Sequence, residues 1–206
     1  MKSKKEVEMS LIPEQRSGTA IDVESVVELH NEKIATVFFE IVKNRLQHVN
    51  NWSIIAGTLS ADFQLVNKEG IEVYRKAQEG DFLKIDIPGP GSKTGKGYDW
   101  VRIEAMESFS NDDDTESFGF RVRPTENPFS NRGDIAHFYS EYSTSTFIVN
   151  RNGNKVSAAV FDRNTKRNEH AHLIEDKVRD NIVAGAAIMT FSHIQWQNLA
   201  DGLLSR

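Results

Sequence analysis

Two segments of alternating apolar and polar residues flank a glycine-rich loop near the middle of the chain. Apolar side chains occupy every second position over residues 83–87 and again over residues 101–105. This period of two is typical of a strand with one face on a core. The loop between them, Gly89 to Gly97, holds four glycines and two lysines. The pattern therefore predicts a strand, a long glycine-rich loop and a second strand.

Apolar residues recur at spacings of three and four at both ends of the chain, which predicts helices there. We expect the first helix to run from about Asp22 to Leu46, with Thr19 or Asp22 as its N-cap. A long second helix is expected over residues 162–189. Ser192 and Gln195 have the spacing of a capping box, which predicts a short final helix.

Further strands are predicted between these helices. Residues 63–65 and 71–73 form one expected pair, residues 118–122 form a strand that Pro124 ends, and another strand is expected at residues 137–139. Asn152-Gly153 separates two apolar runs, and an Asn-Gly pair in that setting is a strong hairpin signal.

The order of elements is one helix, about seven antiparallel strands and one or two closing helices. Strands grouped between helices, without β-α-β alternation, predict an α+β fold with helices on one face of a curved antiparallel sheet. We expect residues 1–20 to be a flexible lead-in and residues 21–206 to be a single domain. In the order of its elements alone, the chain is similar to the helix-grip arrangement of START and Bet v 1 proteins.

Composition narrows the class of protein. The 206 residues carry a net charge of −5, with 27% charged and 38% hydrophobic residues, which indicates a soluble globular protein. The absence of a basic excess argues against a nucleic-acid partner. The chain has no cysteine, so thiol catalysis, cysteine zinc sites and disulfides are excluded, and a cytoplasmic location is expected. The longest apolar run, Ile182 to Met189, is too short to span a membrane.

The glycine-rich loop differs from a phosphate-binding P-loop. That motif needs a glycine where Pro90 stands, a hydroxyl residue where Gly97 stands, and a helix where a strand is predicted. The loop is then either a plain hairpin connection or a docking loop. In the second case Lys93 and Lys96 would attract an anion, while Tyr98 and Trp100 would form a stacking wall.

Charged side chains alternate with the apolar ones on the central strands. They are Lys84 and Asp86 on one strand, Trp100, Arg102 and Glu104 on the next, and Arg121 and Arg123 on a third. One interpretation is a set of cross-strand ion pairs on a solvated face. The other is a concave surface for an acidic ligand, with Trp100 as the anchor and an arginine as the clamp.

No metal, cofactor or catalytic site is predicted. His172 and Asp176 would lie one helical turn apart, but two ligands rarely hold a metal. The acidic run 112–114 is most simply a turn. Ser143, His137 and Asp134 would supply the residue types of a hydrolase triad, but no Gly-x-Ser-x-Gly motif accompanies them.

Two functional hypotheses follow, with an enzyme such as a hydrolase as a distant third. The main one is a non-catalytic interaction or assembly protein that docks a partner or a second copy of itself through Trp100, Trp196, Phe129 and the loop lysines. The alternative is a carrier or sensor of a small apolar or acidic ligand, bound between the sheet and the helix over residues 162–189. An exposed apolar patch around Trp196 and Leu203 would favour the first, and a buried, unpaired arginine would favour the second.

Overall fold

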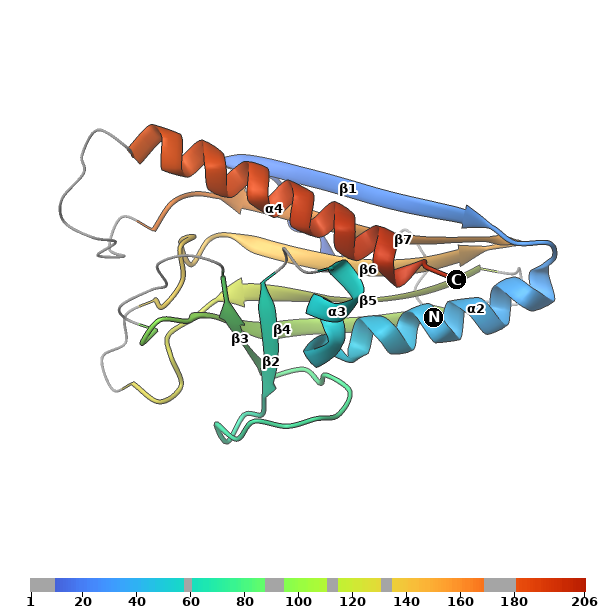
Figure 1. Cartoon of the computed structure of the whole chain (residues 1–206), viewed down its shortest axis with the longest axis horizontal. Coiled ribbons are helices and arrows are strands. Elements are labelled where there is room, and N and C mark those ends of the chain that lie inside the picture. Colours follow the sequence, from blue (N-terminus) through green and yellow to red (C-terminus); the bar gives the residue numbers. More distant parts are fainter. Residues whose placement is uncertain (1–9, 58–60, 88–94, 111–114, 131–134, 169–180) are drawn as a thin grey trace.

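The computed structural model describes residues 10–57, 61–87, 95–110, 115–130, 135–168 and 181–206, with side chains of the last helix described from residue 190. It confirms an α+β fold in which helices pack on an antiparallel sheet (Figure 1). The elements in chain order are β1 (Thr19–Glu28), α2 (Glu32–Gln47), η1 (Val49–Asn51), α3 (Trp52–Ala56), β2 (Asp62–Val66), β3 (Phe82–Asp86), β4 (Asp99–Ser110), β5 (Thr115–Pro124), β6 (Thr144–Asn152), β7 (Lys155–Thr165) and α4 (Asn181–Leu203).

The sheet has the strand order β1-β7-β6-β5-β4-β3-β2, and every neighbouring pair is antiparallel. Strands β1 and β2 therefore form opposite edges, although only α2, η1 and α3 separate them in the chain. These helices carry the chain across one face of the sheet, and α4 lies along the same face (Figure 1). The layer between α2, α4 and this face is the main hydrophobic core.

Trp52 lies at the centre of this core. It is fully buried, and its indole Nε1 donates a hydrogen bond of 3.1 Å to the Leu46 carbonyl. Its ring centroid lies 5.2 Å from that of Phe63 on β2 and 4.8 Å from that of Phe147 on β6. Because such a residue contributes both buried area and ring contacts, it fixes the short α3 against both halves of the sheet.

The first helix begins later than the sequence pattern predicted. Residues 19–28 form the edge strand β1, in which Ile21 and Val23 face the core while Asp22 and Glu24 are exposed. The prediction of a helix there was wrong because β1 pairs with β7 over its length, and this long-range pairing outweighs local preference. Helix α2 starts at Glu32, where the Asn31 side chain caps it by accepting a 3.0 Å hydrogen bond from the Ile34 amide.

The C-terminal prediction also needs correction. Residues 162–165 belong to β7, so no helix runs from residue 162. Helix α4 continues without a break from Asn181 to Leu203, and Ser192 and Gln195 lie inside it instead of capping a separate helix. The expected helical residues between 169 and 180 lie outside the described part of the chain.

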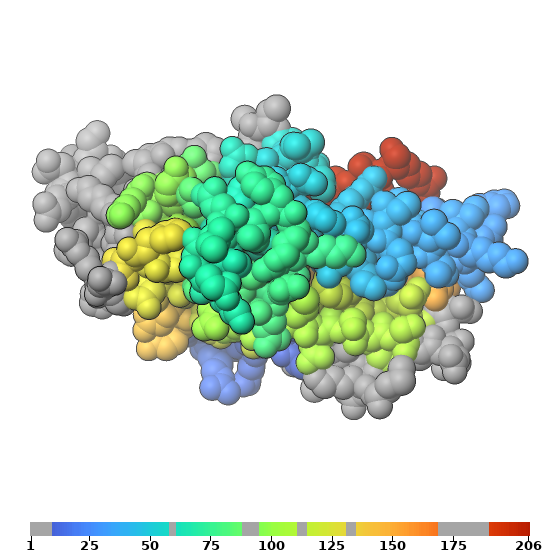
Figure 2. Space-filling view, turned by 90° about the horizontal axis from the view of Figure 1, so that it is seen from below, coloured from blue at the N-terminus to red at the C-terminus, as the bar shows by residue number. Residues whose placement is uncertain are grey.

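Two expected strands are reduced to single bridges, and one hairpin is confirmed. The segment after β2 forms an isolated bridge with it between Val66 and Glu72, and residue 139 forms one with Arg167. Residues 67–81 instead form an irregular connection that covers the centre of the face seen in Figure 2. Strands β6 and β7 form the predicted hairpin, although its two loop residues are Gly153 and Asn154, with Gly153 at φ +58°.

Part of the N-terminal segment packs against the outer face of the sheet, away from the helices. Leu11 is fully buried in a small cluster with Ile148. Its carbonyl accepts hydrogen bonds from Thr146 Oγ1 at 3.1 Å and Arg121 Nη1 at 2.9 Å. Asn164 Oδ1 accepts from the Arg16 amide at 2.7 Å. Residues 10–18 are thus bonded to β5, β6 and β7 before β1 begins.

Candidate functional site

The charged residues of the outer face form an ion-pair network. Glu104 receives Arg123 through two hydrogen bonds, of 2.6 Å from Nε and 3.0 Å from Nη2, and also pairs with Arg121. Burial opposes ionisation of Glu104, but the two guanidinium groups outweigh it and lower the pKa of the carboxyl. Because Arg121 also bonds the buried Leu11 segment, this network holds the chain together and leaves neither arginine free to clamp an acidic ligand.

Several of the remaining predicted contact residues lie next to one another near the glycine-rich loop. Trp100 is 1% exposed, and its ring meets Phe129 edge-on at 5.6 Å. The Tyr98 ring lies 4.3 Å from Lys84 Nζ, a cation–π contact. Lys96 and Arg102 are exposed, and Lys93 lies outside the described residues. The structure therefore brings Tyr98 and Phe129 against Trp100, but Trp100 is buried in this small cluster and does not form an exposed anchor.

The observations expected to separate the two functional hypotheses are both missing from the described residues. Trp196 packs into the core and Leu203 is 2% exposed, so they form no surface patch. Neither Arg121 nor Arg123 is unpaired. The buried charge that does lack a full set of partners is a carboxylate, Asp162.

Asp162 is placed in the core by the alternation of β7. Val156, Ala158 and Val160 all belong to the core under the helices, and Asp162 continues the same series of positions. Its neighbour Arg163 faces the other side of the sheet, where it pairs with the half-exposed Asp22 of β1. The result is an acidic side chain, 1% exposed, at the end of an otherwise apolar row.

The two oxygens of the Asp162 carboxyl have different environments. Oδ2 accepts a 2.9 Å hydrogen bond from the Trp196 indole of α4. Oδ1 is buried and has no hydrogen-bond partner among the described residues. Burial raises the pKa of Asp162 to about 6, against the opposing effects of the Ser145 hydroxyl, the Trp196 indole and Arg163. A buried acceptor without a partner costs about 1–3 kcal/mol, more when charged.

Other polar side chains lie on the same side of the sheet. Ser145 of β6 stands directly opposite Asp162 in the strand register. Tyr139 Oη lies 3.3 Å from Ser192 Oγ on α4, and burial raises the pKa of this tyrosine. Together with Trp196, these residues form what we call the Asp162 cluster: Asp162, Ser145, Trp196, Tyr139 and Ser192.

Aromatic rings of the main core border the Asp162 cluster. The Trp196 ring centroid lies 5.2 Å from that of Phe147 and 6.3 Å from that of Phe63. Trp196 is itself only partly buried. The arrangement thus combines a carboxylate oxygen able to accept a hydrogen bond with neighbouring hydroxyls and aromatic rings, and sits between α4 and the sheet.

Sequence reasoning identified Trp196 but missed Asp162 and Ser145. The signal for Asp162 was present, because it lies in phase with Val156, Ala158 and Val160. Assigning the residues from 162 onward to a helix removed them from the strand and hid that phase. For Ser145 the sequence offers no comparable signal, since small hydroxyl residues are common on both faces of strands.

The residues considered for a hydrolase triad are not assembled as one. His137 Nδ1 accepts a hydrogen bond from the Tyr139 amide, and burial lowers the pKa of this histidine, so it is held neutral. Ser143 Oγ donates to the Asn164 carbonyl at 3.2 Å. Asp134 lies outside the described residues, as do His172, Asp176 and the acidic run 112–114. Among the described residues no cluster of metal ligands occurs.

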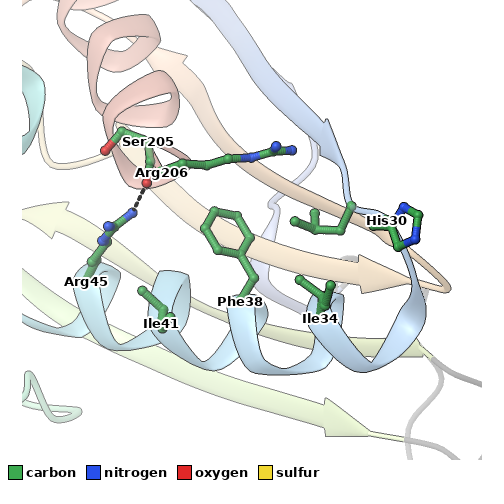
Figure 3. Close-up of a pocket in the computed structure, with 8 residues that line it drawn as sticks. His30, Ile34, Phe38, Ile41, Arg45, Ser205 and Arg206 are labelled. Carbon is green, nitrogen blue, oxygen red and sulfur yellow. Dashed lines mark hydrogen bonds between the residues drawn. The ribbon is translucent and has the colours of Figure 1, made fainter.

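A second feature is an apolar groove between α2 and the C-terminus (Figure 3). It has a volume of about 400 Å³ and is lined by Leu29, His30, Ile34, Phe38, Ile41, Arg45, Ser205 and Arg206. Arg45 Nη1 donates to the carbonyls of Leu203 and Ser205, so the guanidinium closes one end of the groove.

Within the described part of the chain, no helix has the length and apolar character needed to cross a bilayer.

Comparison with known proteins finds likeness only among solved structures. No protein-family model and no curated protein matches the sequence. TTHA0849 from Thermus thermophilus aligns with a TM-score of 0.44 and 6% identity, over 90% of this chain and 94% of that one. Truncated norcoclaurine synthase from Thalictrum flavum gives 0.34 and 9%, over 89% and 96%. Ara h 8.0201 gives 0.34 and 14%, over 88% and 97%. These values are too low to assign a family or an activity.

Proposed function

We propose that this protein binds a small organic molecule between α4 and the sheet, at the Asp162 cluster. The observation that carries the proposal is the buried Asp162 carboxyl, whose Oδ1 finds no partner among the described residues. Native proteins pair almost all of their buried polar atoms, and an exception often marks a functional site. A ligand would supply the missing hydrogen bond.

The surroundings of Asp162 support a ligand with an apolar body. The rings of Trp196, Phe147 and Phe63 offer a wall of the kind that lines small-molecule sites, and the few polar groups beside it would fix orientation. The sequence-based alternative, a carrier or sensor, agrees with this arrangement. An acidic ligand does not, because Arg121 and Arg123 are paired with Glu104 on the opposite face, where Arg102 is exposed.

Native mass spectrometry of the purified protein, followed by spectra of the denatured sample, tests the proposal. We expect extra mass of a small organic molecule on the folded chain and its loss on denaturation. The variant Trp196→Ala should retain less of that mass, whereas Trp100→Phe, which changes the other face of the sheet, should retain as much as the wild type. A protein that carries no extra mass and takes up none of a panel of apolar amines, alcohols and acids would refute the proposal.

Self-association is the second candidate, and one observation favours it. Ile34, Val37 and Ile41 are 46%, 64% and 44% exposed and follow each other on one side of α2, beside the groove of Figure 3. The occupant of this stripe would be a second copy of the chain. The same mass spectra would then show a dimer, which Val37→Lys should dissociate while the exposed control Thr36→Lys should not.

A further inference from the structure

Resting on the proposed function, we infer that the ligand carries a protonated amine, which pairs with Asp162. The argument begins with the charges around the carboxyl. On the core side, its described polar neighbours are the Trp196 indole and the Ser145 hydroxyl, and both are neutral. The nearest cation in the sequence, Arg163, is bonded to Asp22 across the sheet. Thus no described cation is paired with the carboxyl oxygens on the core side, although the charge of Arg163 lowers the pKa of Asp162 through space.

A neutral hydrogen-bond donor and a cationic donor on the ligand would stabilise the Asp162 carboxylate to different degrees. A ligand hydroxyl could donate to Oδ1, but it would leave a negative charge buried without a countercharge. An ammonium group would donate to the same oxygen and also neutralise the charge. Because a buried charge is expensive unless it is paired, the cation gains more from the site than the alcohol does.

The neighbouring side chains suit an amine joined to a flat apolar body. The indole of Trp196 fixes Oδ2, which leaves Oδ1 as the acceptor for the ligand. The Tyr139 and Ser192 hydroxyls can accept the remaining N–H groups of an ammonium, which has three donors. The ring of Trp196 then meets the apolar part of the ligand beside Phe147.

Three matched fluorescent probes test the inference on the full chain. N-dansylcadaverine ends in an ammonium, N-dansyl-5-aminopentanol in a hydroxyl, and N-dansyl-5-aminopentanoic acid in a carboxylate. Dissociation constants at pH 7.5 would be measured for the wild type and for Asp162→Asn. Glu24→Gln is the matched control, because it removes one negative charge from an exposed position of the neighbouring strand β1 and leaves the Arg163–Asp22 pair intact.

We expect the wild type and Glu24→Gln to bind the amine about tenfold more tightly than the alcohol, the size of a charge-assisted hydrogen bond, and the acid most weakly. In Asp162→Asn the preference for the amine over the alcohol should disappear. If Asp162→Asn does not fold, the wild type measured at pH 4.5, where Asp162 is largely protonated, should show the same loss of preference. Equal binding of amine and alcohol by the wild type, or an unchanged preference in Asp162→Asn, would overturn the inference.

The experiments distinguish a wrong assignment of the amine from the absence of small-molecule binding altogether. If the protein retains a small molecule whose accurate mass and fragmentation show no basic nitrogen, small-molecule binding stands and the amine does not. If the protein retains nothing and none of the three probes binds, the proposed function is refuted and the inference with it. Native spectra recorded with each probe distinguish these cases in one experiment.

Discussion

The substitution Asp162→Asn should change how the stability of the protein depends on pH. The pKa of Asp162 is about 6 in the folded protein, against an ordinary value of 3.8. Between these two values the folded state binds more protons than the unfolded state. The free energy of unfolding therefore falls as the pH rises, because the folded protein must either hold a proton or bury a charge.

The size of the effect follows from the two pKa values. The full shift corresponds to about 3 kcal/mol, and the part realised between pH 4.5 and pH 7 is about 2 kcal/mol. At pH 4.5 the folded protein carries a largely protonated Asp162, which resembles asparagine in charge. On going to pH 7, the wild type should thus lose about 2 kcal/mol relative to Asp162→Asn.

Urea unfolding at pH 4.5, 5.5, 6.5 and 7.5, followed by tryptophan fluorescence, measures this change. The quantity of interest is the difference in the free energy of unfolding between the wild type and Asp162→Asn at each pH. Other groups that change protonation on unfolding are common to both proteins and cancel in the difference. Glu24→Gln controls for the loss of one negative charge on the neighbouring strand β1.

A difference between the two proteins that stays constant from pH 4.5 to pH 7.5 would refute the reasoning. So would a difference of the opposite sign, with the wild type gaining on the variant as the pH rises. That second result would mean that folding lowers the pKa of Asp162, as in a carboxylate with a full set of partners. An equal slope in Glu24→Gln would assign the effect to general charge and not to the buried acid.

Three further predictions concern the framework that positions the site. Glu104→Gln should lower the free energy of unfolding by about 2 kcal/mol at neutral pH, since it leaves two arginines without a countercharge. Because folding lowers the pKa of Glu104, this difference from the wild type should shrink below pH 4.5, and urea unfolding measures it. Gly202→Ala should lower the melting temperature, because a Cβ there would lie 2.1 Å from the Ile55 carbonyl oxygen, whereas Asn198→Ala on the exposed side of α4 should not. Leu11→Ala should cost about 2–3 kcal/mol in urea unfolding; no change would mean that the N-terminal segment contributes little to stability.

The α+β class and most of the sheet could be predicted from the sequence because those strands have a regular period of two. In β3 and β4 the alternation is unambiguous, and the structure pairs them antiparallel. The β6–β7 hairpin also has a local turn signal at Gly153. Where period and turn chemistry agree within one short segment, long-range information adds little to the assignment.

Strand β1 shows where local patterns are insufficient. Val23 and Val27 are four residues apart, which fits one face of a helix. The same spacing is an even number of residues, so it also fits one face of a strand. The residue that decides is Asn31, whose side chain caps α2 and thereby marks the start of the helix nine residues after Asp22. The partner strand β7 lies more than a hundred residues away in the chain, so its influence on β1 is absent from any local window.

The misreading of β7 and the missed candidate site have one cause. An acidic residue after an apolar run is usually a sign that a buried element has ended, since burying a charge costs several kcal/mol. In β7 the strand continues, and Asp162 occupies the next core position with Trp196 bonded to one oxygen only. A polar residue at a buried position of an otherwise apolar strand face is a stronger indication of a functional site than an apolar one. Stability alone would favour an apolar side chain at such a position. That conflict is what places the candidate site at Asp162 and not at the glycine-rich loop.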